Sequence, residues 1–168
     1  MPLPLFLPCA AGIEGLLAAE VRGLLTGVEV VEMRGGVALE GDPLEVMKLN
    51  LESRLAQRVL VEVGACDYRG EQELYELARA IDWSDWVTPR HTLRVDTTAH
   101  RSPLRSVNFA ALRVKDAVCD MLREATGQRP NVDTRHPDLQ LMLHLGETRA
   151  WLYVDTSGEA LFKRGWRT

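Results

Sequence analysis

The sequence lacks the short motifs that mark the common catalytic sites. It has no Gly-x-x-x-x-Gly-Lys-Ser/Thr loop, no Gly-x-Gly-x-x-Gly after a strand and no Gly-x-Ser-x-Gly elbow. None of its four histidines has the His-Glu-x-x-His spacing of a zinc site, and its three cysteines stand too far apart for a zinc or redox motif. Its acid pairs stand at helical spacing, which favours a solvated helix face. We therefore expect no catalytic residues and no bound metal in this chain.

A long hydrophobic run is also missing. Residues 1–8 are apolar, but the stretch is short, is broken by prolines and carries no basic residue, so it is neither a signal peptide nor a membrane span. Widely spaced cysteines are typical of a reducing compartment, and we expect a cytoplasmic protein without a membrane partner. The hydrophobic fraction of 46% over 168 residues is enough for a packed core and argues against disorder.

Charge is distributed unevenly along the chain. Residues 1–85 carry a net charge of −8 and residues 86–168 carry +4, which gives the overall −4. This asymmetry indicates either a polyanionic partner for the second half or basic residues scattered over its surface. From His100 to Lys115 there is no acidic residue but four basic ones. Such a stretch suits phosphates, and an RNA backbone is their most common source.

The first third of the chain predicts a β-α-β-β-α-β unit. Strands are expected at residues 3–7, 28–33, 37–39 and 58–63, with a hairpin at Gly35-Gly36. One helix covers residues 13–24, and Asp42 caps the other, which presents an apolar face of Leu44, Met47 and Leu51. Two helices on one face of a four-stranded antiparallel sheet form the ferredoxin-like arrangement, so the fold class is α+β.

The second part predicts helices at residues 74–81 and from about 104 to 125, with strands at 92–98, 139–145 and 148–154 and an edge strand near 160–164. Gly127 is the expected end of the long helix. A helix start at Ser102-Pro103 would place an anion site beside Arg101 and Arg105. Phe109 points away from the apolar stripe, which indicates either a contact with a neighbouring domain or a platform for an unpaired base.

The order of these motifs resembles a THUMP domain preceded by its ferredoxin-like companion. The resemblance rests on Asn108-x-x-Ala111-x-x-x-x-Lys115-Asp116, on Arg129-Pro130-Asn131-Val132-Asp133 and on Pro137-Asp138 before an alternating strand. Further segments are similar to the N-terminal part of bacterial large-subunit rRNA guanine-N2 methyltransferases. These segments are Gly12-Ile13-Glu14, Gly35-Gly36-Val37, Ser53-Arg54-Leu55-Ala56 with Arg58, Val114-Lys115-Asp116-Ala117-Val118 and Leu161 to Arg167.

The resemblance implies a ferredoxin-like domain over residues 1–67, a THUMP RNA-binding domain over 68–158 and a linker from 159 to 168. It implies a targeting module, not an enzyme by itself, that positions structured 23S rRNA for a catalytic domain in cis, which uses S-adenosylmethionine. This chain contains neither the glycine-rich cofactor loop nor the Asn-Pro-Pro-Tyr motif of that domain. The candidate RNA-binding residues are Arg101, Arg105, Asn108, Arg113, Lys115, Arg129, Asn131, Arg135, Lys163 and Arg164.

Two alternatives stay open from the sequence. The chain could be the THUMP module of a tRNA-modifying enzyme, or a ferredoxin-like domain that senses a small molecule or dimerises through its sheet. A reader that stacks bases on its sheet is disfavoured, because the strands at residues 3–7 and 37–39 lack paired aromatic residues. Binding by shape and charge, with little sequence selectivity, is therefore expected.

Overall fold

The fold alternates strands and helices along the chain. The computed structural model describes residues 2–83, 92–127, 131–132 and 139–157, with the backbone alone at 126 and 131–132. The elements are β1 (Leu3–Pro8), α1 (Glu14–Leu24), β2 (Val31–Met33), β3 (Gly36–Gly41), α2 (Pro43–Glu52), β4 (Leu60–Asp67), α3 (Glu71–Arg79), β5 (Thr92–Ala99), α4 (Val107–Thr126), β6 (Asn131–Val132), β7 (Leu139–Leu145) and β8 (Arg149–Asp155).

All these strands join one sheet of eight, in the order β2-β3-β1-β4-β8-β7-β5-β6. The first four strands and two helices have the predicted ferredoxin-like order, and the mixed α+β class is confirmed. Strand β5 pairs in parallel with β6 and β7, and the other pairs are antiparallel. Strand β4 pairs with β1 near its start and with β8 along its length. The predicted subdomains thus share a sheet, while the boundary at residues 67 and 68 stays a prediction.

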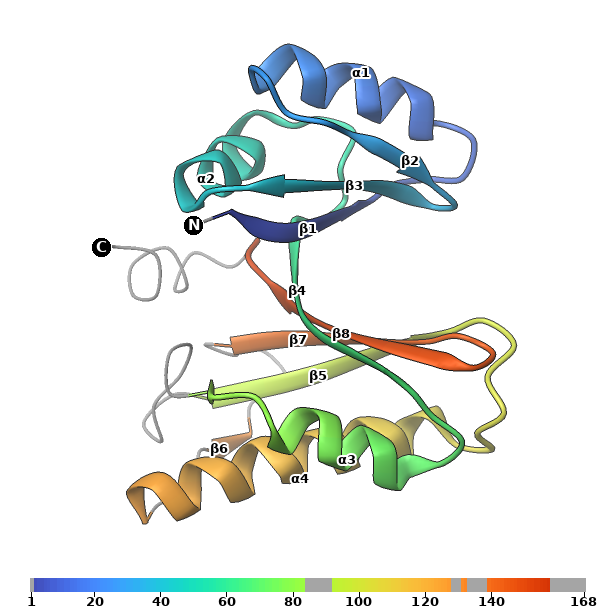
Figure 1. The fold of residues 1–168 in the computed structure, drawn as a ribbon, viewed down its shortest axis with the longest axis vertical. Coiled ribbons are helices and arrows are strands. Elements are labelled where there is room, and N and C mark those ends of the chain that lie inside the picture. The colour runs from blue at the N-terminus through green and yellow to red at the C-terminus, as the bar shows by residue number, and fades with distance from the viewer. Residues whose placement is uncertain (1, 84–91, 128–130, 133–138, 158–168) are drawn as a thin grey trace.

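The helices cover one face of this sheet and leave the other face open. Helices α1 and α2 lie over the N-terminal half-sheet and α3 and α4 over the C-terminal half-sheet, so the two open faces turn toward each other across β4 (Figure 1). The pairing of β4 with β8 shifts by one residue between Glu62 and Gly64. Because a strand alternates its sides, the extra residue lets both Val61 and Gly64 face helices. A Cβ at Gly64 would lie only 2.9 Å from Leu77 Cδ1 of α3.

The core follows the predicted periodicity in the second half more closely than in the first. In β7 the residues Leu139, Leu141, Leu143 and Leu145 are all buried, as their alternation predicts. Helix α4 buries Ala110, Val114, Ala117, Val118, Cys119 and Leu122. The apolar face predicted for α2 was wrong, because Leu44 and Leu51 are 75% and 82% exposed while Val46 and Leu49 are buried. The helix is therefore rotated from the predicted orientation, so that Val46 and Leu49 face the sheet.

Local signals set several of the element ends. The Asp42 carboxylate accepts a hydrogen bond from Glu45 N at 2.7 Å, and Asp42 N donates to Glu45 Oε1 at 3.0 Å, which forms a capping box. Gly127 ends α4 in the left-handed conformation with φ +81°, as predicted. The predicted centre of the hairpin was shifted by one residue. Gly35 turns with φ +80°, whereas Gly36 already pairs with Met33.

The backbone of β1 packs so closely on Gly36 that no side chain fits at this position. A Cβ on Gly36 would lie 2.4 Å from the Leu7 carbonyl oxygen of β1, which is backbone and cannot move aside. We expect Gly36→Ala to lower the free energy of unfolding by about 1–3 kcal/mol, measured by urea denaturation.

Gly23→Ala is the matched control. No atom lies within 4 Å of the position that a Cβ would take at this helical glycine. The same substitution there should raise the free energy of unfolding by about 0.5–1 kcal/mol. Equal effects at the two positions would contradict the packing argument.

Candidate nucleic-acid interface

The connection between β5 and α4 carries the basic residues that the sequence singled out. His100 N donates to Leu145 O at 2.9 Å, and Tyr68 Oη lies 2.8 Å from Ser102 Oγ. Arg101 has φ +56°, a left-handed conformation that is uncommon outside glycine. Both Arg101 and Arg105 are exposed. The first part of the loop is therefore held on both sides of Arg101, by the His100 backbone and the Ser102 side chain, while the two arginines face solvent.

The start of α4 differs from the prediction. The helix begins at Val107, and Ser106 caps it by accepting a hydrogen bond from Phe109 N at 3.1 Å. Ser102 instead accepts from Leu104 N at 3.2 Å within the loop. The predicted helix start at Ser102-Pro103 was therefore wrong, because Ser106 caps the helix. Anion binding near Arg101 and Arg105 stays a prediction. The actual helix N-terminus lies between Arg105 and Asn108, both exposed.

The remaining predicted residues fall into different environments. The Arg113 guanidinium carbon lies 4.4 Å from the centre of the Tyr75 ring, and Tyr75 Oη donates to Asp120 at 2.8 Å. Arg113 thus joins α4 to α3, and Lys115 is partly exposed on the same helix. Asn131 is described by its backbone alone, in β6 beside Thr92. Arg129, Arg135, Lys163 and Arg164 lie outside the described residues.

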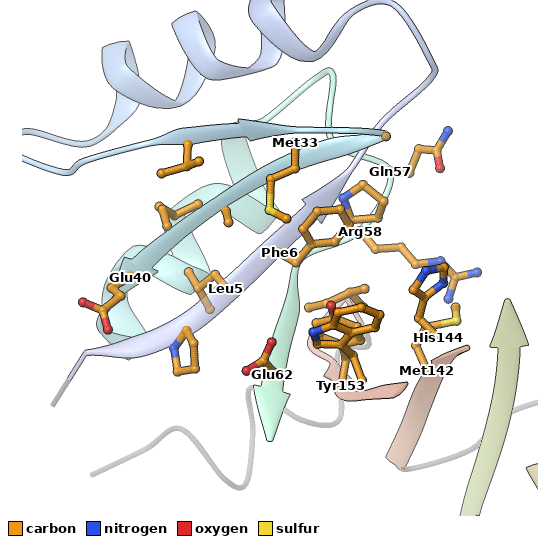
Figure 2. A pocket seen from close by; sticks show the side chains of 18 of the residues that line it. Leu5, Phe6, Met33, Glu40, Gln57, Arg58, Glu62, Met142, His144 and Tyr153 are labelled. Atoms are coloured by element: carbon orange, nitrogen blue, oxygen red, sulfur yellow. The ribbon is translucent and has the colours of Figure 1, made fainter. Parts of the chain in front are cut away.

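A groove on the open face of the sheet was not foreseen from the sequence. It has a volume of about 1070 Å³ and lies between the two half-sheets (Figure 2). Its floor and walls include residues of seven strands, β1 to β5 with β7 and β8. The side chains that matter below are Phe6, Met33, Arg34, Glu40, Arg58, Glu62, Met142, His144, Trp151 and Tyr153.

Aromatic rings line the middle of this groove. The centres of the Phe6 and Tyr153 rings lie 6.1 Å apart, and those of His144 and Trp151 lie 5.6 Å apart. Phe6 is paired with Leu60 of β4, and β4 is paired with β8, so strand pairing brings Phe6 to Tyr153 across the sheet. Sequence reasoning missed these contacts because it considered each strand alone. The available signal was the spacing of two in Trp151 and Tyr153, which places both side chains on one face.

The two ends of the groove differ in charge. Arg58 and His144 lie at one end and Glu40 at the other, with Glu62 between Glu40 and the Tyr153 ring (Figure 2). At the basic end, Arg34 Nη1 of the β2–β3 turn lies 3.3 Å from His100 Nε2 of the β5–α4 loop. Arg58 donates to Asp155 Oδ2 at 2.7 Å. The basic end of the groove is therefore continuous with the loop that presents Arg101.

Burial in the groove shifts the pKa values of its ionisable groups. Desolvation raises the pKa of Glu62, against a smaller opposing effect of the Arg149 charge. Burial also raises the pKa of Tyr153 far above its ordinary range, with the Glu62 charge adding to the effect. Burial lowers the pKa of His144, and the His100 charge adds to that effect. The Nδ1 atom of His144 lies 2.7 Å from Thr98 Oγ1, which fixes the ring against β5.

The turn after the parallel strand β5 does not resemble a nucleotide-cofactor site, and the described residues contain no metal-binding cluster. Dinucleotide and S-adenosylmethionine sites of open parallel sheets use a glycine-rich turn from a strand into a helix. The turn that leads from the parallel strand β5 into α4 spans residues 100–106 and contains no glycine. Across the described ranges, no three His, Cys, Asp or Glu side chains gather in a way that could hold a metal ion. No helix in the same ranges is long and apolar enough to cross a membrane.

Two protein-family models match this chain. The family model described as "THUMP domain" matches residues 68–155, and the "RlmL ferredoxin-like domain" matches residues 4–60. The chain is 40% identical over 99% of its length to the ribosomal RNA large subunit methyltransferase K/L of Syntrophotalea carbinolica, and 41% identical over 96% to that of Ectopseudomonas mendocina. It covers only 23% and 22% of these two relatives.

A solved structure has the same fold. The crystal structure of a predicted N6-adenine-specific DNA methylase from Listeria monocytogenes superposes with a TM-score of 0.80 at 25% sequence identity. The match covers 92% of this chain and 40% of that one. The relatives thus contain a counterpart of this whole chain together with a larger remainder.

The raised pKa of Glu62 generates a prediction on pH dependence. Because the folded state holds the Glu62 proton more tightly than the unfolded chain, this residue favours folding below its ordinary pKa of 4.5. That contribution is lost as the pH rises through the folded-state pKa. We expect Glu62→Gln to raise the free energy of unfolding at pH 7 relative to the parent, and the gain to disappear at pH 4. Urea denaturation at pH 7 and at pH 4 measures the free energy of unfolding of both proteins.

Glu40→Gln, at an exposed position of the same groove, is the control and should show no such difference between the two pH values. If Glu62→Gln gained as much stability at pH 4 as at pH 7, the raised pKa of Glu62 would be contradicted.

Proposed function

Because the chain belongs to the THUMP domain family and carries an RlmL-type ferredoxin-like domain, we propose that it is an RNA-binding targeting module. In this proposal it positions structured 23S rRNA so that a catalytic domain in cis, which uses S-adenosylmethionine, methylates the exocyclic N2 of a guanine. The chain itself performs no chemistry. The rRNA large subunit methyltransferases that it resembles supply the substrate class.

The observation that carries the proposal is the exposed basic surface at the start of α4. Arg101 and Arg105 face solvent from a loop that is held by a backbone hydrogen bond from His100 to β7 and by a side-chain hydrogen bond between Ser102 and Tyr68. An ordered loop presents its cations at fixed spacing, which suits the regular phosphates of a folded RNA. The exposed Asn108 in the first turn of the helix adds a neutral hydrogen-bonding group, and the helix N-terminus adds partial positive charge.

The other proposed contacts have unequal support. Lys115 lies two turns further along α4 and extends the surface, whereas Arg113 is occupied by Tyr75 and contributes chiefly by joining the helices. Arg129, Asn131, Arg135, Lys163 and Arg164 remain proposed contacts. A lone Arg–phosphate contact in solvent is weak, so affinity has to come from several contacts acting together.

The RNA contacts can be tested through the salt dependence of binding. We expect Arg105→Ala and Lys115→Ala each to weaken binding of a structured rRNA fragment. Each should reduce the slope of log affinity against log salt concentration by about 0.7–0.9. Filter binding at four salt concentrations gives the slope. Lys48→Ala is the control, because this exposed lysine lies on α2, on the far side of the N-terminal half-sheet.

Competition separates the substrate classes. Displacement of the rRNA fragment by unlabelled tRNA at lower concentration than by the fragment itself would point to a tRNA-modifying enzyme. An unchanged slope in Arg105→Ala and Lys115→Ala together would contradict the assigned surface.

A further inference from the structure

The groove on the open face of the sheet has no role in the contacts proposed above. We propose that it is a second RNA site, which holds unpaired nucleotides with their bases stacked on the aromatic rings and their phosphates at the Arg34–His100 end. The inference rests on the proposed function, since it specifies how the same RNA continues beyond α4. The proposed ligand is single-stranded RNA next to a helical stem.

The rings are arranged as a stacking platform. Phe6, Trp151 and His144 are each partly exposed, so part of every ring surface stays open to the groove. Each is supported from behind or beside by another ring, at 6.1 Å for Phe6 with Tyr153 and 5.6 Å for His144 with Trp151. The hydrogen bond between Thr98 and His144 further restricts the imidazole. A base that stacks here meets side chains already held in place, so little conformational entropy is lost on binding.

The charges of the groove give a bound strand a direction. Phosphates are favoured at the end where Arg34 lies beside His100 and disfavoured toward Glu62 and Glu40. Arg58 contributes less at the basic end, because its guanidinium is already paired with Asp155. The carboxylate of Glu62 is next to the rings, because Glu62 is paired with Tyr153 across β4 and β8. A carboxylate accepts hydrogen bonds from the exocyclic amino groups of bases. The acidic end therefore suits base edges and the basic end suits the backbone.

The groove is also in line with the proposed phosphate contacts. His100, which touches Arg34 at the basic end, is followed directly by Arg101 and then by Arg105 at the start of α4. An RNA backbone that leaves α4 along this loop reaches the groove without crossing an acidic residue of the loop. The groove volume of about 1070 Å³ is at the upper end of the ~300–1,000 Å³ of small-molecule sites. That size fits a short run of nucleotides better than one small metabolite.

The experiment compares two RNAs and matched variants of the full chain. One RNA is a blunt rRNA hairpin, and the other is the same hairpin with a four-nucleotide 3′ overhang; binding is followed by fluorescence anisotropy at constant salt. We expect the overhang to tighten binding by the parent chain. Phe6→Leu and Trp151→Leu should each weaken binding of the overhang RNA about fivefold or more and leave the blunt hairpin unchanged. Leu44→Ala removes an exposed apolar side chain from α2, outside the groove, and should change neither. Phe109→Leu tests the exposed ring on α4 as the alternative stacking platform.

The remaining outcomes decide between the proposals. Trp151→Phe keeps a ring and should bind the overhang RNA nearly as the parent does, which guards against a folding defect in Trp151→Leu. Blunt-hairpin binding without any gain from the overhang would overturn the groove site and leave the proposed function standing. A larger loss in Phe109→Leu than in the groove variants would also overturn it. So would groove variants that bind both RNAs normally but change the elution volume in size-exclusion chromatography, since the face would then be a protein interface. If the parent chain bound neither RNA, both proposals would be overturned.

Discussion

The antiparallel pairing of β4 with β8 is the constraint on which the rest of the structure depends. It runs from Leu60 opposite Asp155 to Asp67 opposite Arg149, and it is the seam between the two half-sheets. Beside it, the Thr156 hydroxyl donates to Val59 O at 2.6 Å, over a sequence separation of 97 residues. Closing so long a loop costs entropy, which the buried strands on both sides of the seam offset. The groove, its ring contacts and its charged ends exist only once this pairing has formed.

The pairing of β4 with β8 also brings charged residues of the two halves of the sequence together. The sequence divides into an acidic first half and a basic second half, and that division favours RNA contacts in the second half alone. In the folded chain, however, Arg34 of the first half lies 3.3 Å from His100 of the second. The basic surface is thus built from both halves, while Glu40 lies at the opposite end of the groove. Net charge by segment describes composition, and the pairing of strands decides where the charges gather.

Sequence reasoning succeeded where a single element determines the result. The alternation of Leu139 to Leu145 predicts which side of β7 is buried, and Asp42 before a proline predicts a helix start, because each signal is local. It failed where two answers differ only in tertiary packing. Helix α2 contains apolar residues on more than one face, so the choice of Val46 and Leu49 over Leu44 and Leu51 is made by the sheet beneath. The order of motifs was sufficient for the family, whereas the groove joins strands that are distant in sequence and had no local signal.

The one-sided placement of the helices leaves an apolar sheet face open to solvent, and that has a cost unless the face binds something. On this face the rings provide stacking, which depends little on ionic strength, whereas the loop and α4 provide cations, whose contribution falls steeply with salt. The two surfaces meet at His100, so one RNA can use both. At low salt the cations dominate and discriminate little between sequences. At higher salt the stacking contribution becomes a larger share of the affinity, and the preference for an unpaired segment beside a stem should therefore grow as total affinity falls. Under the two proposals, the module selects its RNA by the junction of helix and single strand, which neither surface would recognise alone.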